Sequence, residues 1–183
     1  MLDGALLALT KGTPYDIEFR IRHADGRELW INDRGYPLRD AAGDIVKVTG
    51  VAADITHRKR DEAQRRLSAQ AFESIADGVL VTDAERRIVS MNKAYCAIFG
   101  YTHEDVIGKT PPLFRSSHHD AAFYDAIWED VGRAGFWRGE VWGCRRNGED
   151  FSALLSVSAV KDTTGVTNHY VGVFTDISDV KRY

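Results

Sequence analysis

Short runs of apolar residues separated by polar turns cover most of the second half of the chain and predict five β-strands. The predicted strands are 78–83, 87–91, 137–145, 150–160 and 168–177. The polar stretch Ala84-Glu85-Arg86 joins the first two in a pattern typical of a β-hairpin. The pair Asn147-Gly148 joins the next two and favours a type I′ turn, in which both central residues take a positive φ.

Between the second and third predicted strands, apolar residues recur at the spacing of α-helices. Asn92 is predicted to cap a first helix that ends at Gly100, and a second short helix ends at Gly108. The segment Ser117-His118-His119-Asp120 has the pattern of a capping box and predicts a third helix, which ends between residues 132 and 135. Two strands, three helices and three strands in this order indicate an α+β domain with one antiparallel sheet.

Residues 57–75 contain neither proline nor glycine and predict a helix that links two parts of the chain. Ala63, Leu67, Ala71 and Ile75 fall on one stripe of this helix, near the spacing of a coiled-coil seam. An isolated short helix is marginal in water, so we expect a second chain or the protein's own sheet to cover the stripe.

The segment from Glu18 to Arg60 recurs without a gap as Glu140 to Arg182, at a constant offset of 122 residues (140 − 18 = 122). A recurrence at this distance indicates two copies of one domain rather than a solenoid, whose periods are about 20 to 50 residues. The predicted organisation is the end of a first copy in residues 1–56, the linker helix in 57–75, a complete second copy in 76–178 and the start of an exit helix in 179–183.

The first copy lacks the two leading strands and the helices of the second. Its three strands, joined by turns at Asp25-Gly26 and Asp40-Ala41-Ala42-Gly43, would leave one face of the sheet without cover. We therefore expect this copy to be poorly ordered or to be covered by another chain.

Composition narrows the class of protein. Hydrophobic residues make up 44% of the chain, charged residues 28%, and the net charge is −3, which is typical of a soluble globular protein. The charges are interspersed, so we expect no binding of nucleic acid. No apolar stretch approaches the roughly 20 residues of a membrane span, and the opening residues do not form a secretory signal, so we expect a cytoplasmic segment without membrane contact. Cys96 and Cys144 are interpreted as packing residues, because they form neither a metal-ligand spacing nor a disulfide scaffold.

Six short motifs occur in order at characteristic spacing: Asp77-Gly78, Asn92-Lys93-Ala94, Phe99-Gly100-Tyr101, Trp137-Arg138-Gly139-Glu140, Arg145-Arg146-Asn147-Gly148, and Asp176-Ile177-Ser178, which matches Asp54-Ile55-Thr56 in the first copy. Together they make the chain resemble the PAS superfamily of sensor domains. The resemblance implies a PAS fold, with a five-stranded antiparallel sheet and helices on one face, preceded by a partial PAS copy and a linker helix.

The stretch from Gly108 to Tyr124 also resembles PAS domains of bacterial proteins that carry GGDEF and EAL output domains for cyclic di-GMP turnover. The resemblance implies a sensor that regulates an output domain missing from this chain, a diguanylate cyclase or phosphodiesterase. The expected partners are that covalently linked output domain and a second copy of the chain, which would dimerise through the linker helix and the sheet.

Seven residues are candidates for a ligand or cofactor cavity beneath the sheet: Asn92, Trp128, Trp137, Trp142, Phe151, Ser156 and Tyr170. The aromatic ones could equally be plain core. The first expectation is that no cofactor is bound, FAD ranks second and haem ranks third. FAD is implied by a resemblance to the flavin-binding PAS domain of a nitrogen-fixation redox regulator. That resemblance rests on the segment Gly108-Lys109, on Trp137 with Gly139, and on Arg145-Arg146. Haem is implied by His103, His118 or His119, any of which could serve as an axial ligand.

Other chemistry has less support. Lys109, Thr110, Pro111 and Pro112 stand where light-sensing flavin domains need a cysteine, which excludes a photoadduct. The adjacent histidines His118 and His119 point about 100° apart on a helix, which disfavours a metal site. No phosphate-binding loop, nucleophile elbow or zinc-protease motif is present, so we expect no catalytic residues and no enzymatic activity in this chain.

The recurring motif at the two strand ends suggests how a signal leaves each domain. Asp54, Ile55 and Thr56, with Asp176, Ile177 and Ser178, are predicted to relay it, with the aspartates accepting hydrogen bonds at the strand–helix junctions. The function expected first is a sensor of a small ligand, a redox state or a partner. Two alternatives remain: a flavin- or haem-bearing redox sensor, and a ligand-free dimerisation relay of a histidine kinase.

Overall fold

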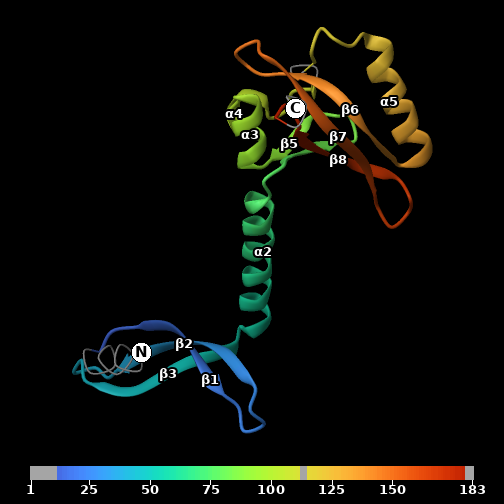
Figure 1. Ribbon diagram of the computed structural model, residues 1–183. Coiled ribbons are helices and arrows are strands. Elements are labelled where there is room, and N and C mark those ends of the chain that lie inside the picture. The colour runs from blue at the N-terminus through green and yellow to red at the C-terminus, as the bar shows by residue number, and fades with distance from the viewer. Residues whose placement is uncertain (1–11, 112–114, 180–183) are drawn as a thin grey trace. The chain divides into compact units, whose positions relative to one another are not determined.

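The computed structural model describes residues 12–111 and 115–179, which fall into two compact units that divide between Ser68 and Ala69. Figure 1 shows the helices and strands of each unit. None of the helices in the described part of the chain is long and apolar enough to cross a membrane.

The first unit is a three-stranded antiparallel sheet followed by a helix. Its strands β1 (Tyr15–Arg22), β2 (Glu28–Arg39) and β3 (Ile45–Asp54) lie in the order β1-β2-β3. Helix α2 (Thr56–Ser74) begins two residues after β3 and closely matches the predicted linker helix.

The second unit is the larger one. It contains β4 (Gly78–Asp83), β5 (Ile88–Met91), α3 (Lys93–Phe99), α4 (His103–Val106), α5 (Ala121–Ala134), β6 (Phe136–Cys144), β7 (Asp150–Lys161) and β8 (Thr167–Asp176). The five strands form an antiparallel sheet in the order β5-β4-β8-β7-β6. The last strand of the chain is thus the central strand of the sheet, and the predicted α+β fold is confirmed. Apart from Asp179, the predicted exit helix lies outside the described residues.

The hydrophobic core of this unit fills one face of the sheet. Tyr95 and Phe99 of α3 are fully buried, and their ring centroids lie 4.4 Å apart. Phe99 also meets the rings of Phe151 at 5.2 Å and Phe174 at 5.1 Å, both edge to face. Because Val106 of α4 and residues of α5 join the same buried cluster, the three helices cover a single face.

The hairpin at Asn147-Gly148 corrects the predicted turn type. Among the described residues of this hairpin only Gly148 has a positive φ, of 86°. The Gly148 N–H donates to the Arg145 carbonyl at 2.9 Å, and the Arg145 N–H donates to the Glu149 carbonyl at 2.8 Å. The loop is therefore a four-residue turn that closes on one left-handed glycine, rather than a type I′ turn, which needs two positive φ angles.

The predicted cap of the first helix is confirmed, and that of the third differs. Asn92 caps α3 by accepting from the Tyr95 N–H at 3.0 Å, and Thr102 begins α4 with a capping box to Asp105. The predicted capping box at Ser117 is wrong. Asp120 is the cap of α5, because its carboxylate accepts from the Phe123 N–H at 2.9 Å and the helix begins at Ala121.

The two sheets differ in exposure although their sequences match. Every residue of β3 is exposed, whereas most of the matching strand β8 is half-buried. In the first unit, Val46 and Val51 are 64% and 69% exposed. Apolar side chains so exposed on a sheet favour a cover, so the expectation that another polypeptide covers this sheet stays a prediction.

Candidate functional site

A cavity of about 100 Å³ lies in the second unit between the inner face of the sheet and helix α5. Its wall consists of Leu80, Thr82, Pro111, Arg115, Tyr124, Ile127, Trp128, Val141, Trp142, Gly143, Leu155, Val157, Tyr170, Gly172 and Phe174. Most of these side chains are apolar, so the cavity favours an apolar occupant.

Three of the seven predicted cavity residues line this space: Trp128, Trp142 and Tyr170. The rings of Trp128 and Tyr170 meet edge to face, with centroids 5.2 Å apart. They form one aromatic corner of the wall, between α5 and β8.

The other predicted residues lie elsewhere among the described part of the second unit. Phe151 packs in the core against Phe99, and Trp137 meets the Phe123 ring at 6.4 Å. Ser156 lies between Leu155 and Val157, which both line the cavity, so its side chain points to the opposite face of the strand.

Asn92 has a structural position rather than a place in the cavity wall. It is fully buried, and its Oδ1 accepts from the Val79 N–H at 2.9 Å as well as from the Tyr95 N–H. Its Nδ2 lies within 3.0–3.3 Å of three backbone carbonyls, of Phe72, Ile75 and Asp77. One amide thus fastens the end of α2 to β4 and α3.

Arg115 and Tyr124 line the cavity and were not predicted from the sequence. The Arg115 guanidinium lies 4.5 Å above the Tyr124 ring. Burial raises the pKa of the Tyr124 hydroxyl, which makes no hydrogen bond of good geometry with any described residue. Neither residue lies in the repeated segment, so internal comparison of the two copies could not have pointed to them.

A second arginine supports the wall from outside. The Arg86 guanidinium lies 4.3 Å above the Trp128 ring, which is a cation–π contact. Arg86 also has a φ of 65°, because it ends the β4–β5 turn at the position where the other hairpins carry glycine. The contact between Arg86 and Trp128 was not predicted from the sequence.

The two histidines hold the edge of the sheet. His119 Nε2 accepts from the backbone N–H of Trp142 at 3.0 Å, and its ring stacks on Phe123 at 3.8 Å. Burial, with the neighbouring His118, holds the pKa of His119 below its usual value, which suits an accepting, neutral imidazole. His118 Nε2 lies 3.2 Å from Asp150 Oδ2. No group of three or more potential metal-binding side chains occurs within the described residues.

The end of β8 is tied to the core through Arg145. Asp176 Oδ1 accepts from the Ser178 N–H at 2.9 Å, and Asp176 Oδ2 lies 2.7 Å from Arg145 Nη2. Arg145 also donates to the Ile98 carbonyl and lies 4.1 Å above the Phe151 ring. Partial burial acts to raise the pKa of Asp176, but the contacts with Ser178 and Arg145 outweigh it and lower the pKa.

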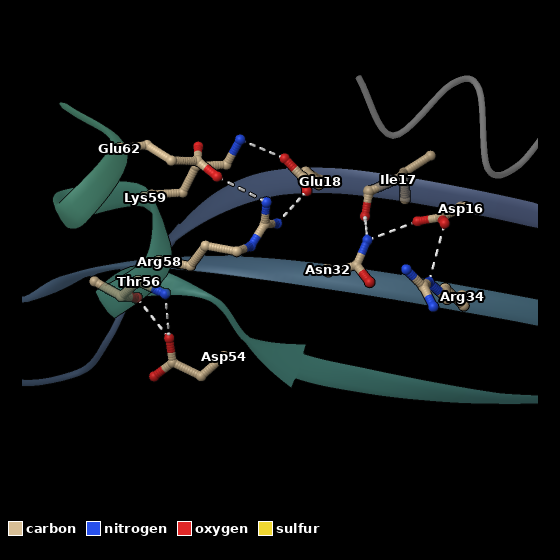
Figure 2. Close-up of polar contacts among 10 residues, drawn as sticks. All are labelled: Asp16, Ile17, Glu18, Asn32, Arg34, Asp54, Thr56, Arg58, Lys59 and Glu62. Atoms are coloured by element: carbon tan, nitrogen blue, oxygen red, sulfur yellow. Dashed lines mark hydrogen bonds and ion pairs between the residues drawn. The ribbon is translucent and has the colours of Figure 1, made fainter. Parts of the chain in front are cut away.

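The first unit has a matching junction, drawn in Figure 2. Asp54 Oδ1 accepts from the Thr56 N–H at 2.9 Å and from its hydroxyl at 2.6 Å. The Ile55 N–H donates to the Trp30 carbonyl at 2.8 Å, and the Ile177 N–H donates to the Ser152 carbonyl at 3.0 Å, again at an offset of 122 residues. The predicted hydrogen bonds at the strand–helix junctions are therefore present in both units.

The first junction carries an additional ionic contact (Figure 2). Glu18 of β1 lies 2.5 Å from both Lys59 Nζ and Arg58 Nη2 in the first turns of α2. Hydrogen bonds from these two cations lower the pKa of Glu18. Lys59 Nζ also lies 5.0 Å from the Trp30 ring, so the start of α2 is held against the sheet of its own unit.

The comparisons with known proteins identify the family. The model of the PAS domain family matches residues 76–179, more than half of the chain, and a second model, described as PAS fold, matches residues 4–52. The chain therefore belongs to the PAS domain family, a class of sensor modules.

Among curated proteins, the chain is similar to the biofilm dispersion protein BdlA of Pseudomonas aeruginosa, with 27% identity over 161 residues. It is also similar to the sensor protein FixL of Bradyrhizobium diazoefficiens, with 26% identity over 178 residues. The alignments include 87% and 92% of this chain but only 38% and 35% of those proteins. The crystal structure of a PAS domain from Colwellia psychrerythraea matches with a TM-score of 0.59 and 21% identity, over 63% of this chain and 98% of that one.

The cavity is small for the cofactors considered. Pockets for drug-sized ligands are roughly 300–1,000 Å³, and a cavity of about 150 Å³ holds a single benzene ring. With about 100 Å³, the space as it stands accommodates neither the three fused rings of a flavin nor a porphyrin. The residues present fit a smaller guest.

Proposed function

We propose that this chain is the sensory region of a cytoplasmic signalling protein, in which a small molecule enters the cavity of the second unit and alters strand β8. The observation that carries the proposal is that one strand both lines the cavity and leads to the junction. β8 contributes Tyr170, Gly172 and Phe174 to the cavity wall and ends at the Asp176 junction.

Arg145 provides a second connection between core and junction. Its guanidinium contacts Asp176, the carbonyl at the end of α3 and the Phe151 ring. A guest that displaces Phe174 or the neighbouring Phe99 ring also acts on Phe151, and thereby on Arg145. The junction residues Asp54, Ile55 and Thr56 relay a change from the first unit to α2 in the same way.

The output is proposed to be a cyclic di-GMP enzyme, a diguanylate cyclase or phosphodiesterase, located elsewhere in the parent protein. The resemblance of residues 108–124 to PAS domains of such proteins supports this, as does the similarity to a biofilm dispersion protein. A histidine-kinase relay is the second candidate, and the similarity to a protein named as a sensor over most of this chain favours it.

The chain is proposed to act as a homodimer through α2 and the sheet. Leu67 and Ile75, on the apolar stripe of the linker, are 59% and 42% exposed. Apolar residues at coiled-coil spacing that stay exposed in one chain are buried when two such helices pair.

The test of the relay is the variant Asp176→Ala in the full-length parent protein. We expect regulated output to become constant, while the melting temperature of the sensory region changes little, because the carboxylate lies at the edge of the core. Asp162→Ala is the matched control, since Asp162 also accepts hydrogen bonds after a strand, from Thr164 at 2.8 Å, but lies at the β7–β8 turn. Normal regulation in Asp176→Ala, or an equal loss in the control, would refute the relay.

A further inference from the structure

Building on the proposed ligand sensor, we infer that the guest is a small monocarboxylic acid. Its apolar tail occupies the cavity, and its carboxylate is held at the rim by Arg115 and the Tyr124 hydroxyl. Nothing in the similarity to known proteins assigns such a ligand, and the inference rests on the chemistry of the wall.

The inner wall offers almost nothing polar to a guest. Most side chains on its sheet side are apolar, among them Leu80, Leu155 and Val157. Thr82, the hydroxyl residue on this side, is buried and already donates to the Asp83 carbonyl at 3.0 Å. A guest with a polar group inside the cavity would therefore lose hydrogen bonds with water and gain none, which disfavours sugars, amino acids and dicarboxylates.

The rim, by contrast, offers a cation and a hydroxyl. Within the described residues, the Arg115 guanidinium has no carboxylate partner, unlike Arg145 and Arg146, which pair with Asp176 and Asp105 at 2.7 Å. Arg115 is exposed and its guanidinium carbon lies 4.5 Å from the centre of the Tyr124 ring, so the N–H groups of its planar fork are accessible at the rim. That fork matches a carboxylate in shape and charge, whereas it repels an amine.

Tyr124 adds a second contact at the same place. Its hydroxyl is buried beside the Ser116 backbone N–H, which can only donate, so the phenol proton has no acceptor among the described residues, and its ring carries Arg115. A phenol at neutral pH donates its proton to a carboxylate. Asp150, whose charge also acts on Tyr124, lies 3.2 Å from His118 and forms no ion pair with Arg115.

The volume limits the tail. A cavity of about 150 Å³ holds the six carbons of benzene, so about 100 Å³ holds roughly four carbons. With the carboxyl carbon at the rim, the best-fitting straight-chain acid is close to pentanoate.

The experiment measures binding to the purified chain by calorimetry and by amide NMR shifts, with four probes of similar length: pentanoate, pentan-1-ol, pentylamine and glutarate. We expect pentanoate to bind about tenfold more tightly than pentan-1-ol, because it adds a charge-assisted contact at an exposed rim. Pentylamine and glutarate should bind least. Shifts should centre on the amides of Leu155, Val157 and Gly172.

Variants separate the rim from the cavity. Arg115→Gln should abolish the tenfold preference and leave the affinity for pentan-1-ol unchanged, and Tyr124→Phe should reduce it several-fold. Arg138→Gln is the control, since Arg138 is an exposed arginine of β6 outside the cavity wall.

The outcomes distinguish this inference from the proposed function. Equal binding of pentanoate and pentan-1-ol, with shifts in the cavity, overturns the carboxylate assignment and leaves a small-molecule sensor. A preference for pentanoate that survives Arg115→Gln also overturns the assignment. Absence of cavity shifts with every probe overturns both, because no guest then enters.

Discussion

Asn92 is the residue whose replacement tests the structure of the second unit most directly. In Asn92→Ala the two buried N–H groups of Val79 and Tyr95 lose their acceptor, and the Asp77 carbonyl, 3.0 Å from Nδ2, loses its donor. Each buried group left without a partner costs about 1–3 kcal/mol, and for the Tyr95 N–H this cost is the loss of the helix cap, about 1 kcal/mol. Because the carbonyls of Phe72 and Ile75 lie near the end of α2 and can turn to water, we expect a total loss of about 4 kcal/mol in the second unit.

The assay must report on this unit alone, because a chain of two units does not unfold in one step. Native-state amide exchange of Tyr95 and Phe99 gives the free energy of opening around α3. Asn168→Ala serves as the control, since Asn168 is exposed and contacts only His169 in its described surroundings, at 3.0 Å. A loss below about 1 kcal/mol in Asn92→Ala, or an equal loss in the control, would show that the buried amide does not hold these elements together.

The variant Asn92→Asp adds a test with a defined sign. An aspartate keeps the acceptor for Val79 and Tyr95 but turns an oxygen towards three carbonyls, which favours the protonated acid and raises the pKa of the new carboxyl. Because the folded carboxyl then binds its proton more tightly than the unfolded one, the stability of Asn92→Asp relative to the unaltered chain should rise as the pH falls from about 7 to 4. A stability difference between the two proteins that stays flat over this range would contradict the geometry of the amide.

Two further predictions concern the wall of the cavity. The pKa of His119 is lowered in the fold, so the neutral form is favoured and the thermal stability should decline as the pH falls below about 6.5. The variant His119→Gln keeps an acceptor for the Trp142 N–H and should remove the part of this decline that His119 causes. An unchanged pH profile in the variant would argue against the contact. At position 86 the backbone φ is 65°, so Arg86→Gly should be about 1 kcal/mol more stable than Arg86→Ala in chemical denaturation. Both variants lose the contact with Trp128, and only glycine relieves the strain of the positive φ. Equal stability of the two variants would mean that the turn is not strained.

The fold was largely predictable because its signals are local. Asn92 marks a helix start, Gly100 ends that helix with a φ of 76°, and the repeated turns fix where strands end. The repeat also predicted the matching junctions at Asp54 and Asp176, because matching residues at the ends of matching strands form the same hydrogen bonds. The errors were local as well. Asp120 and Ser117 are both good caps three residues apart, and which of them caps α5 depends on packing of the following helix.

The candidate site was only partly predictable. Alternation along a strand shows which residues share a face, and Tyr170, predicted as one of seven candidates, lines the cavity. Alternation does not show where along that face packing leaves a space, so Phe151 and Trp137, which fill the core beside the cavity, were indistinguishable from Trp142, which lines it. Arg115 and Tyr124 were missed because the contact between this cation and this ring joins a residue of the loop before α5 to a residue of α5, and periodicity within a helix does not predict which loop residue meets it.

The central position of β8 has a consequence for how the protein is made. Until β8 leaves the ribosome, the β4–β5 ribbon and the β6–β7 ribbon have no shared strand, and the sheet exists only as two halves. Because β4 pairs with a strand that follows it by about ninety residues in the chain, closure of the sheet waits for a long loop and for the synthesis of β8. A nascent chain stalled before residue 167 would therefore expose the edges of both ribbons to chaperones and to neighbouring chains. Cellular quality control would thus act on a prematurely stopped chain before that chain could take part in signalling.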